Sequence, residues 1–144
     1  MRRLGRIAAA VLLAGSSTAA LAAHGKAGLW STTTTMTMSG MEGMKMPPQT
    51  HAGTFCMTQQ AVNADAPPKP ESPSCQVQNV RHAGNTVSAD MVCHGQMEAT
   101  GHFSTTYDSD THYRAQMSMA MQGMTMNNAI EGKWLKADCA GATP

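Results

Sequence analysis

The segment M-S-M-A-M-Q-G-M-T-M, residues 117–126, carries methionine at five of its ten positions. On each side of its central Q-G pair the methionines are two residues apart, which is the spacing at which a β-strand returns to one face of a sheet. The Q-G pair is suited to a two-residue hairpin turn, because glycine readily adopts the positive φ that such a turn requires. The predicted hairpin pairs its methionines across the turn: Met121 with Met124, and Met119 with Met126.

A second methionine tract, residues 36–46, lies about eighty residues earlier in the chain. Residues 28–38 read G-L-W-S-T-T-T-T-M-T-M, and their alternation and threonine content predict a strand with its apolar side chains on one face. Residues 39–48 are rich in glycine and proline, which predicts a loop. If the first strand pairs antiparallel with the last, Met38 arrives beside Met124. Both methionine clusters are then expected at the same end of the protein.

The rest of the chain continues the strand pattern. Apolar and polar positions alternate through residues 97–107, 113–121 and 124–134, and a short helix is expected between Thr58, as its N-cap, and Ala64. These patterns predict an all-β fold, an antiparallel meander of about seven strands that forms a small barrel or a strongly curved sheet. The expected register places small residues opposite large ones: Ala99 opposite Met121, and Gly101 opposite Met119.

Residues 1–23 have the features of a Sec-type secretory signal peptide. A basic start is followed by the apolar run 7–13 and then by small residues with an A-x-A site at 20–22, so cleavage is expected after this site to within one residue. Residues 24–144 would form a single methionine-rich β domain in the periplasm or outside the cell. No later apolar run reaches the roughly 18 residues of a membrane span, so the mature chain is not expected to cross a membrane.

Four cysteines in an exported chain of this size indicate two disulfides. A hairpin that turns at residues 83–85 with a three-residue loop places Cys75 directly opposite Cys93, as a cross-strand disulfide requires. This pairing leaves Cys56 for Cys139. A two-residue turn would shift the register by one residue and remove the basis of the assignment.

The charge of the chain argues against nucleic-acid and anionic-membrane partners. Cleavage removes three of the ten basic residues, so seven Lys and Arg face nine Asp and Glu, and the formal charge moves from +1 to about −2. A charge this weak and scattered gives no basic surface for phosphates. The aromatic residues are also too few for a platform on which bases stack.

Several segments together resemble the bacterial exported family catalogued as domain of unknown function 3617. In order, they are the signal peptide, K-A-G-L-W at 26–30, the Met/Gly/Pro tract through Pro48, F-C-M-T at 55–58, the cysteine hairpin, the methionine hairpin, and G-K-W-L at 132–135 followed by Cys139. One departure is Ala27, where the family usually has proline. The resemblance supports the compartment and the fold. It implies no activity, because the family has none assigned.

Soft-metal binding is the function that the methionine spacing favours. Thioether sulfur prefers soft ions such as Cu(I) and Ag(I), and M-x-M and M-x-x-M spacings allow neighbouring sulfurs to converge on one ion. With all cysteines paired, methionine and histidine are the remaining soft or borderline ligands. The predicted site draws on the loop, the hairpin and one histidine: Met41, Met44, Met46, Met121, Met124, Met126 and His51.

Two other interpretations remain open. Methionine also fills irregular cores in place of leucine, and the strand methionines Met36, Met38, Met91, Met97, Met117 and Met119 are expected to be core residues. The main alternative function is binding of an apolar, lipid-like small molecule in a β-barrel, with the methionines serving only as core. A protein-contact role or a store of oxidisable methionine is also consistent with the composition.

Enzymatic function is not expected. The sequence has no G-x-S-x-G, H-E-x-x-H or phosphate-binding glycine loop. His82, His94 and His112 fall at or near predicted turns, and His102 falls on an outer face. These histidines are expected to be solvated surface residues, and no catalytic residue is assigned.

Overall fold

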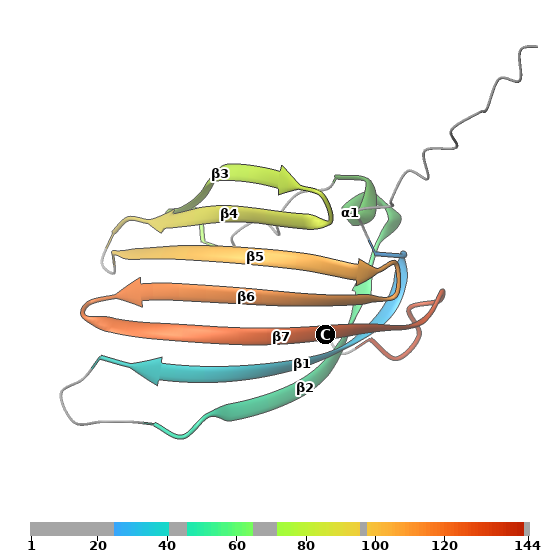
Figure 1. Cartoon of the computed structure of the whole chain (residues 1–144), viewed down its shortest axis with the longest axis horizontal. Coiled ribbons are helices and arrows are strands. Elements are labelled where there is room, and N and C mark those ends of the chain that lie inside the picture. The colour runs from blue at the N-terminus through green and yellow to red at the C-terminus, as the bar shows by residue number, and fades with distance from the viewer. Residues whose placement is uncertain (1–24, 41–45, 65–71, 96–97, 143–144) are drawn as a thin grey trace, which may run out of the picture.

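The computed structural model describes residues 25–40, 46–64, 72–95 and 98–142. These residues form one antiparallel sheet and one short helix (Figure 1), in the order β1 Gly28–Ser39, β2 Gln49–Met57, α1 Gln59–Ala64, β3 Cys75–Ala83, β4 Thr86–Cys93, β5 Ala99–Ser109, β6 His112–Met121 and β7 Met124–Lys136. The strand order across the sheet is β2-β1-β7-β6-β5-β4-β3. The predicted all-β meander with one short helix is confirmed.

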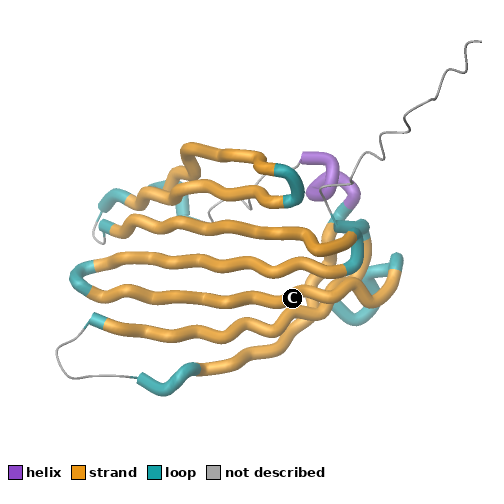
Figure 2. The backbone as a smooth tube through the Cα atoms, in the orientation of Figure 1, coloured by secondary structure: helices purple, strands orange, loops and turns teal. Residues whose placement is uncertain are grey.

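The sheet is open and curved and is not a closed barrel. β1 pairs antiparallel with β7, as expected, but β2 and β3 then lie at opposite edges of the sheet. Figure 2 shows β1 and β2 bending away behind the flatter central strands. Of the two predicted forms, the strongly curved sheet is the one observed.

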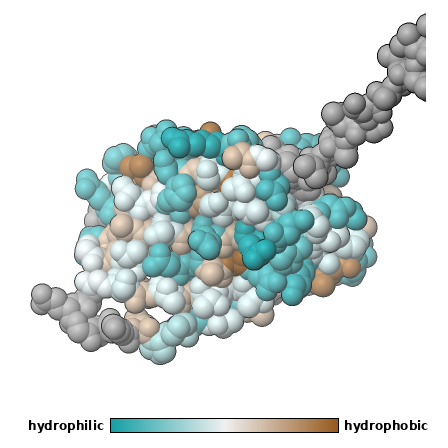
Figure 3. Space-filling view, viewed as in Figure 1, coloured by the Kyte–Doolittle hydropathy of each residue, from teal (hydrophilic) through white to brown (hydrophobic). Residues whose placement is uncertain are grey.

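The two faces of the sheet differ in chemistry, as the two-residue period of a strand requires. On the face that we call the apolar face, every residue of β1 and of β4 to β7 is buried or half-buried. Its larger side chains are Trp30, Met36, Met38, Val87, Met91, Phe103, Tyr107, Tyr113, Met117, Met119, Met121, Met124, Met126, Asn128, Ile130 and Trp134. The opposite, polar face carries Asp90, His102, Asp108, His112, Arg114, Glu131 and Lys133. Figure 3 shows hydrophilic patches among side chains of near-neutral hydropathy.

The most deeply buried part of the apolar face is an aromatic cluster, which we call the aromatic end. Trp30 has no exposed surface, and its ring centroid lies 5.4 Å from that of Tyr113, which in turn lies 5.7 Å from that of Tyr107. The segment before β1 closes this end, because the Trp30 Nε1–H donates to the Lys26 carbonyl at 2.8 Å. A Cβ on Gly25 would lie 2.6 Å from the Trp30 ring, so the backbone of this segment packs directly on the indole.

Methionine does not supply the buried core. The hydrophobic residues that are buried in the described part of the chain are Leu29, Trp30, Val87, Ala89, Ala99 and Tyr113. The predicted core methionines that the structure describes are half-buried on the apolar face, and Met97 lies outside the described residues. The described chain contains one sheet and a six-residue helix that lies at one end of β3 and β4, so the methionine side chains have no second sheet to pack against (Figure 1).

Both disulfides are formed as predicted, Cys75 with Cys93 and Cys56 with Cys139. The expected three-residue loop in the cysteine hairpin is wrong, because Ala83 pairs with Thr86 and leaves a two-residue turn. A bulge between Gln78 and Arg81 restores the register, so that the two cysteines are again directly opposite. Two one-residue offsets therefore cancel.

The bulge has an identifiable stabilising contact. Asn79 adopts a φ of 54°, a left-handed conformation that asparagine tolerates better than most residues. Its side-chain Nδ2 donates to Asp90 Oδ2 at 2.8 Å on the neighbouring strand. A bulge changes the direction of a side chain, and here it turns Asn79 toward Asp90. This hydrogen bond favours the extra residue at the bulge rather than in the turn.

The helix is short and capped as expected. The Ala61 N–H donates to Thr58 Oγ1 at 3.1 Å, which makes Thr58 the N-cap of α1. No helix within the described residues is long and apolar enough to cross a membrane.

Candidate functional site

The methionine hairpin has the predicted geometry. β6 and β7 pair so that Met121 lies opposite Met124 and Met119 lies opposite Met126. The turn between them is the Gln122-Gly123 pair, whose φ values of 47° and 80° are both positive, as a tight two-residue hairpin turn requires.

A third strand adds to this cluster, in a register that differs from the expectation. Met38 of β1 lies opposite Met126 and not beside Met124. The position across from Met124 is taken by Gly40, where a Cβ would lie 2.8 Å from the Met124 Cα and closer still to the Gly123 carbonyl oxygen. The register of β1 on β7 is therefore shifted by two residues from the prediction, and Gly40, directly after β1, packs against the hairpin turn.

A fourth methionine reaches the same row from β4. Met91 lies opposite Gly101, which in turn lies opposite Met119. A Cβ on Gly101 would lie 3.8 Å from the Met91 methyl carbon, so the Met91 side chain extends over the glycine toward β6. We call the set Met38, Met126, Met119 and Met91 the methionine row.

The spacing within the methionine row suits a shared ligand. β6, β7 and β1 are consecutive strands, about 4.8 Å apart, and directly opposed Cβ atoms lie roughly 5 Å apart. A methionine side chain has three rotatable bonds, so sulfurs from three such positions can converge above the central strand. Each of these methionines is half-buried, which leaves part of the side chain open to solvent.

The chemistry of the site is that of uncharged sulfur. All four cysteines are in disulfides, so no thiolate competes with the thioethers. Among the described residues, no group of three or more His, Cys, Asp or Glu side chains is placed to hold a metal ion. The side chains at this end of the apolar face therefore suit a soft ion and offer little to a hard one.

The structure brings only some of the predicted site residues together. Met121, Met124 and Met126 share one patch. Met46 is 48% exposed and precedes β2. His51 lies opposite Thr34, four residues or roughly 13 Å along β1 from Met38, and so is separate from the patch. Met41 and Met44 lie outside the described residues.

Sequence reasoning had assigned three members of the row to the core: Met38, Met91 and Met119. The signal for them was nevertheless present. Gly101 was predicted to lie opposite Met119. Because glycine has no side chain, this position leaves space on the apolar face that a long side chain from the next strand can occupy. The missing step was the pairing of β4 with β5, which places Met91 across from the same glycine.

Asn128 interrupts the apolar face one row away from the methionine row. It lies between Met36 of β1 and Met117 of β6 in the register of the sheet. Its Oδ1 is inaccessible to solvent and has no hydrogen-bond partner in the described part of the chain. A buried acceptor without a partner typically costs about 1–3 kcal/mol, so this oxygen marks a local destabilisation within the face.

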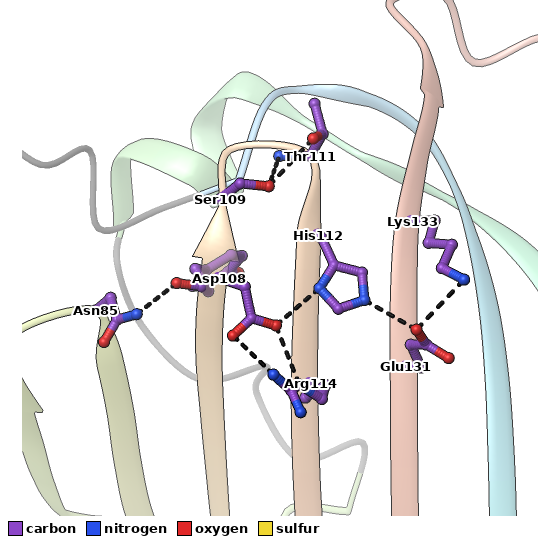
Figure 4. A network of polar contacts seen from close by, with 9 residues as sticks. Asn85, Asp108, Ser109, Thr111, His112, Arg114, Glu131 and Lys133 are labelled. Atoms are coloured by element: carbon purple, nitrogen blue, oxygen red, sulfur yellow. Dashed lines mark hydrogen bonds and ion pairs between the residues drawn. The ribbon is translucent and has the colours of Figure 1, made fainter.

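A network of charged side chains near the aromatic end lies on the polar face (Figure 4), whereas Lys26, which pairs with Asp110 at 2.9 Å, lies 5.5 Å from the centroid of the Trp134 ring. Asp108 binds Arg114 and His112, and His112 also contacts Glu131 Oε1 through Nε2 at 2.9 Å. The Arg114 hydrogen bond, with a further contribution from His112, lowers the pKa of Asp108. Hydrogen bonds from His112 and Lys133 lower the pKa of Glu131. This network ties β5, β6 and β7 together.

A second carboxylate–histidine pair lies further along the same face. His102 Nδ1 and Asp90 Oδ1 are 2.8 Å apart, and this contact, with the Asn79 amide, lowers the pKa of Asp90. Both partners are substantially exposed. The charged groups therefore face away from the methionine row, on the opposite side of the sheet.

Comparison with known proteins adds the family. Searches of curated proteins and of solved structures gave no match. The model of one family matches residues 25–139, which include every described strand and both disulfides. The family is described as "Protein of unknown function (DUF3617)", and the chain belongs to it.

Proposed function

We propose that this protein binds a soft monovalent metal ion, Cu(I) or Ag(I), through the methionine row. The observation that carries the proposal is the register of three consecutive strands, which places Met119, Met126 and Met38 side by side on one face. Three thioethers are a sufficient ligand set for such an ion, because both ions accept low coordination numbers and prefer sulfur.

The surroundings support selectivity for a soft ion. Zinc and harder cations require imidazole, carboxylate or thiolate ligands, and the described residues of the apolar face near the row offer none of them. Met121, Met124 and Met91 flank the three central methionines and can replace one of them as the side chains move. The loop methionines Met41, Met44 and Met46 remain predicted additional ligands.

A titration tests the proposal. The protein with intact disulfides would be titrated with Cu(I) in competition with a chromophoric chelator, alongside the variant in which Met38, Met119 and Met126 are all Leu. We expect the wild type to retain one Cu(I) and the triple variant to bind at least about tenfold more weakly, since leucine keeps the volume and removes the sulfur. Met57→Leu is the matched control, because Met57 pairs with Gly28 at the other end of β1.

Two results would contradict the proposal. One is a wild-type protein that retains no Cu(I) against the chelator. The other is equal affinity in the wild type and the triple variant. A separate variant with Met41, Met44 and Met46 all replaced by Leu measures how much the loop contributes. Export through residues 1–23 and the absence of a catalytic role stay predictions of the sequence.

A further inference from the structure

The apolar face continues beyond the methionine row toward the aromatic end. The row after Met36, Asn128 and Met117 contains mostly short side chains: Thr34, Ile130, Ala115 and Thr105. Beyond it lies Tyr113, whose ring occupies the space above Gly132, where a Cβ would lie 2.0 Å from the Tyr113 Cε1. The face between Asn128 and Tyr113 is thus bounded by an amide at one end and by an aromatic ring at the other.

This part of the face is uncharged. The charged side chains of β4 to β6, with Glu131 and Lys133 of β7, point to the polar face, where they pair with other charged residues or face solvent. Lys136, at the far end of β7 beyond Trp134, pairs with Asp138. An occupant that matches the face in charge is therefore a neutral molecule with an apolar body. A molecule with a carboxylate, phosphate or ammonium group would meet no counter-charge here.

Asn128 adds a specific polar requirement. Its Oδ1 is the buried side-chain oxygen that lacks a partner in the described chain, and an amide oxygen only accepts hydrogen bonds. The group that satisfies it must be an O–H or N–H donor. Met36 and Met117, its neighbours in the register, are unbranched and flexible, so we expect the packing around this oxygen to adapt to a ligand.

We propose that the apolar face holds an uncharged ligand with an apolar body and one hydroxyl or N–H donor, which donates to Asn128 Oδ1. The apolar body lies over Ile130 and Ala115 and ends against the Tyr113 ring. Asn128 and Gly132 are four residues apart on β7, which gives the body a length of roughly 13 Å. This site is adjacent to the methionine row and does not depend on metal binding there.

The test uses two probes that differ only in the donor, decanol and decyl methyl ether. Each would displace Nile red from delipidated protein in the presence of a metal chelator. For the wild type we expect decanol to bind about tenfold more tightly than the ether, because only decanol can donate to the asparagine. In Asn128→Leu we expect the two probes to bind equally, with the ether affinity unchanged.

The thermal stability of Asn128→Leu distinguishes the loss of the hydrogen bond to the ligand from unfolding of the variant. Asn128→Leu removes a buried acceptor without a partner, so we expect a thermal midpoint at or above that of the wild type. Asn127→Leu is the matched control, because this exposed residue faces the opposite side of the sheet and should leave the tenfold preference intact. Equal binding of decanol and ether by the wild type, or an unchanged preference in Asn128→Leu, would overturn the proposal. Metal titration of the same samples shows whether the methionine row is functional independently of this result.

Discussion

The two ends of the apolar face are made by the same strands and differ in how their side chains are held. At the aromatic end, Trp30 is fully buried, its indole N–H donates to the Lys26 carbonyl, and the Tyr113 ring lies beside it at an interplanar angle of 46°. At the methionine end, the methionine side chains are half-buried, and the neighbouring Asn128 Oδ1 has no partner in the described chain. The aromatic end is thus deeply buried with its indole N–H hydrogen-bonded, whereas the methionine end is less buried and contains an unpaired hydrogen-bond acceptor.

A glycine illustrates the difference at each end. Gly132 receives the Tyr113 ring so closely that a Cβ would lie 2.0 Å from a ring carbon, whereas a Cβ on Gly101 would lie 3.8 Å from the Met91 methyl group. Both glycines create space for a neighbouring side chain. The aromatic ring fills the space above its glycine, whereas the Met91 side chain leaves room for a methyl group at ordinary van der Waals distance and belongs to a flexible residue type.

The largest expected effect is at Gly132. Gly132→Ala should lower the free energy of unfolding by about 3 kcal/mol, because the new methyl group must displace the buried Tyr113 ring. Gly101→Ala should cost no more than about 1 kcal/mol, because the new methyl group would lie 3.3 Å from the Ser118 carbonyl oxygen and at an ordinary 3.8 Å from Met91. Urea denaturation of both variants measures the difference, and Gly53→Ala, where the nearest atom is 4.0 Å away, serves as a control. Similar losses at Gly132 and Gly101 would remove the contrast between the ends.

The aromatic end should also be sensitive to alkaline pH. Burial, with a contribution from the nearby Tyr107, raises the pKa of Tyr113 to about 12. The folded protein therefore holds this proton more tightly than the unfolded chain, whose tyrosine pKa is about 10. The resulting stability is complete below about pH 10 and is lost as the pH rises through 12. The thermal midpoint should decline between about pH 9 and pH 12, which is roughly the titration range of tyrosine. Tyr113→Phe should reduce this decline.

The methionine end should tolerate substitution by leucine. Each of Met38→Leu, Met119→Leu and Met126→Leu should change the free energy of unfolding by less than about 1.5 kcal/mol, because volume and hydrophobicity are nearly conserved. Urea denaturation of the single variants gives the values. A loss of several kcal/mol from any one of them would show that this end is packed as specifically as the aromatic end.

The smallest expected effect comes from the polar side of the aromatic end. The pKa values of Asp108 and Glu131 are lowered by their hydrogen bonds to Arg114 and His112, so the folded state favours their ionised forms. Their stabilisation is present above the ordinary carboxyl pKa values of about 4 and is lost as the pH falls through the lower folded values. The thermal midpoint should fall slightly between about pH 5 and pH 3. His112→Gln should weaken this dependence, and an unchanged slope would argue against a role for the network.

Much of the fold followed from periodicity. Strand alternation together with the expected turns placed Met121 opposite Met124 and Gly101 opposite Met119, and both pairings are observed. Cys75 also lies opposite Cys93 as predicted, but in that hairpin the wrong turn length is compensated by the bulge. The first two predictions succeeded because a strand has a fixed two-residue period and a short turn fixes the register of its hairpin.

The position of the bulge and the register of β1 on β7 were not predicted, because the alternation of apolar and polar residues does not encode them. The bulge at Asn79 depends on a hydrogen bond to Asp90, a residue of another strand, and so its position is not visible in the local pattern. The end of β1 depends on the contact of Gly40 with the hairpin turn, which a register drawn from pairing alone cannot supply. For the candidate site, the sequence predicted the pairing of the hairpin methionines, whereas the methionine row depends on the registers of β1 and β4, which the sequence pattern did not supply. Soft-metal binding itself stays a proposal.

The two disulfides acquire a further meaning from the openness of the sheet. An edge strand is held by backbone hydrogen bonds on one side only, so an open sheet is expected to unfold from its edge strands inward. Cys56 belongs to β2 and Cys75 to β3, the two outermost strands, and each is joined covalently to a different part of the chain. In a closed barrel the two edge strands would be stabilised by pairing with each other. In this open sheet a disulfide restrains each edge strand instead. Under reducing conditions the sheet should unzip first at these two strands, while the central strands that carry the methionine hairpin stay paired longest.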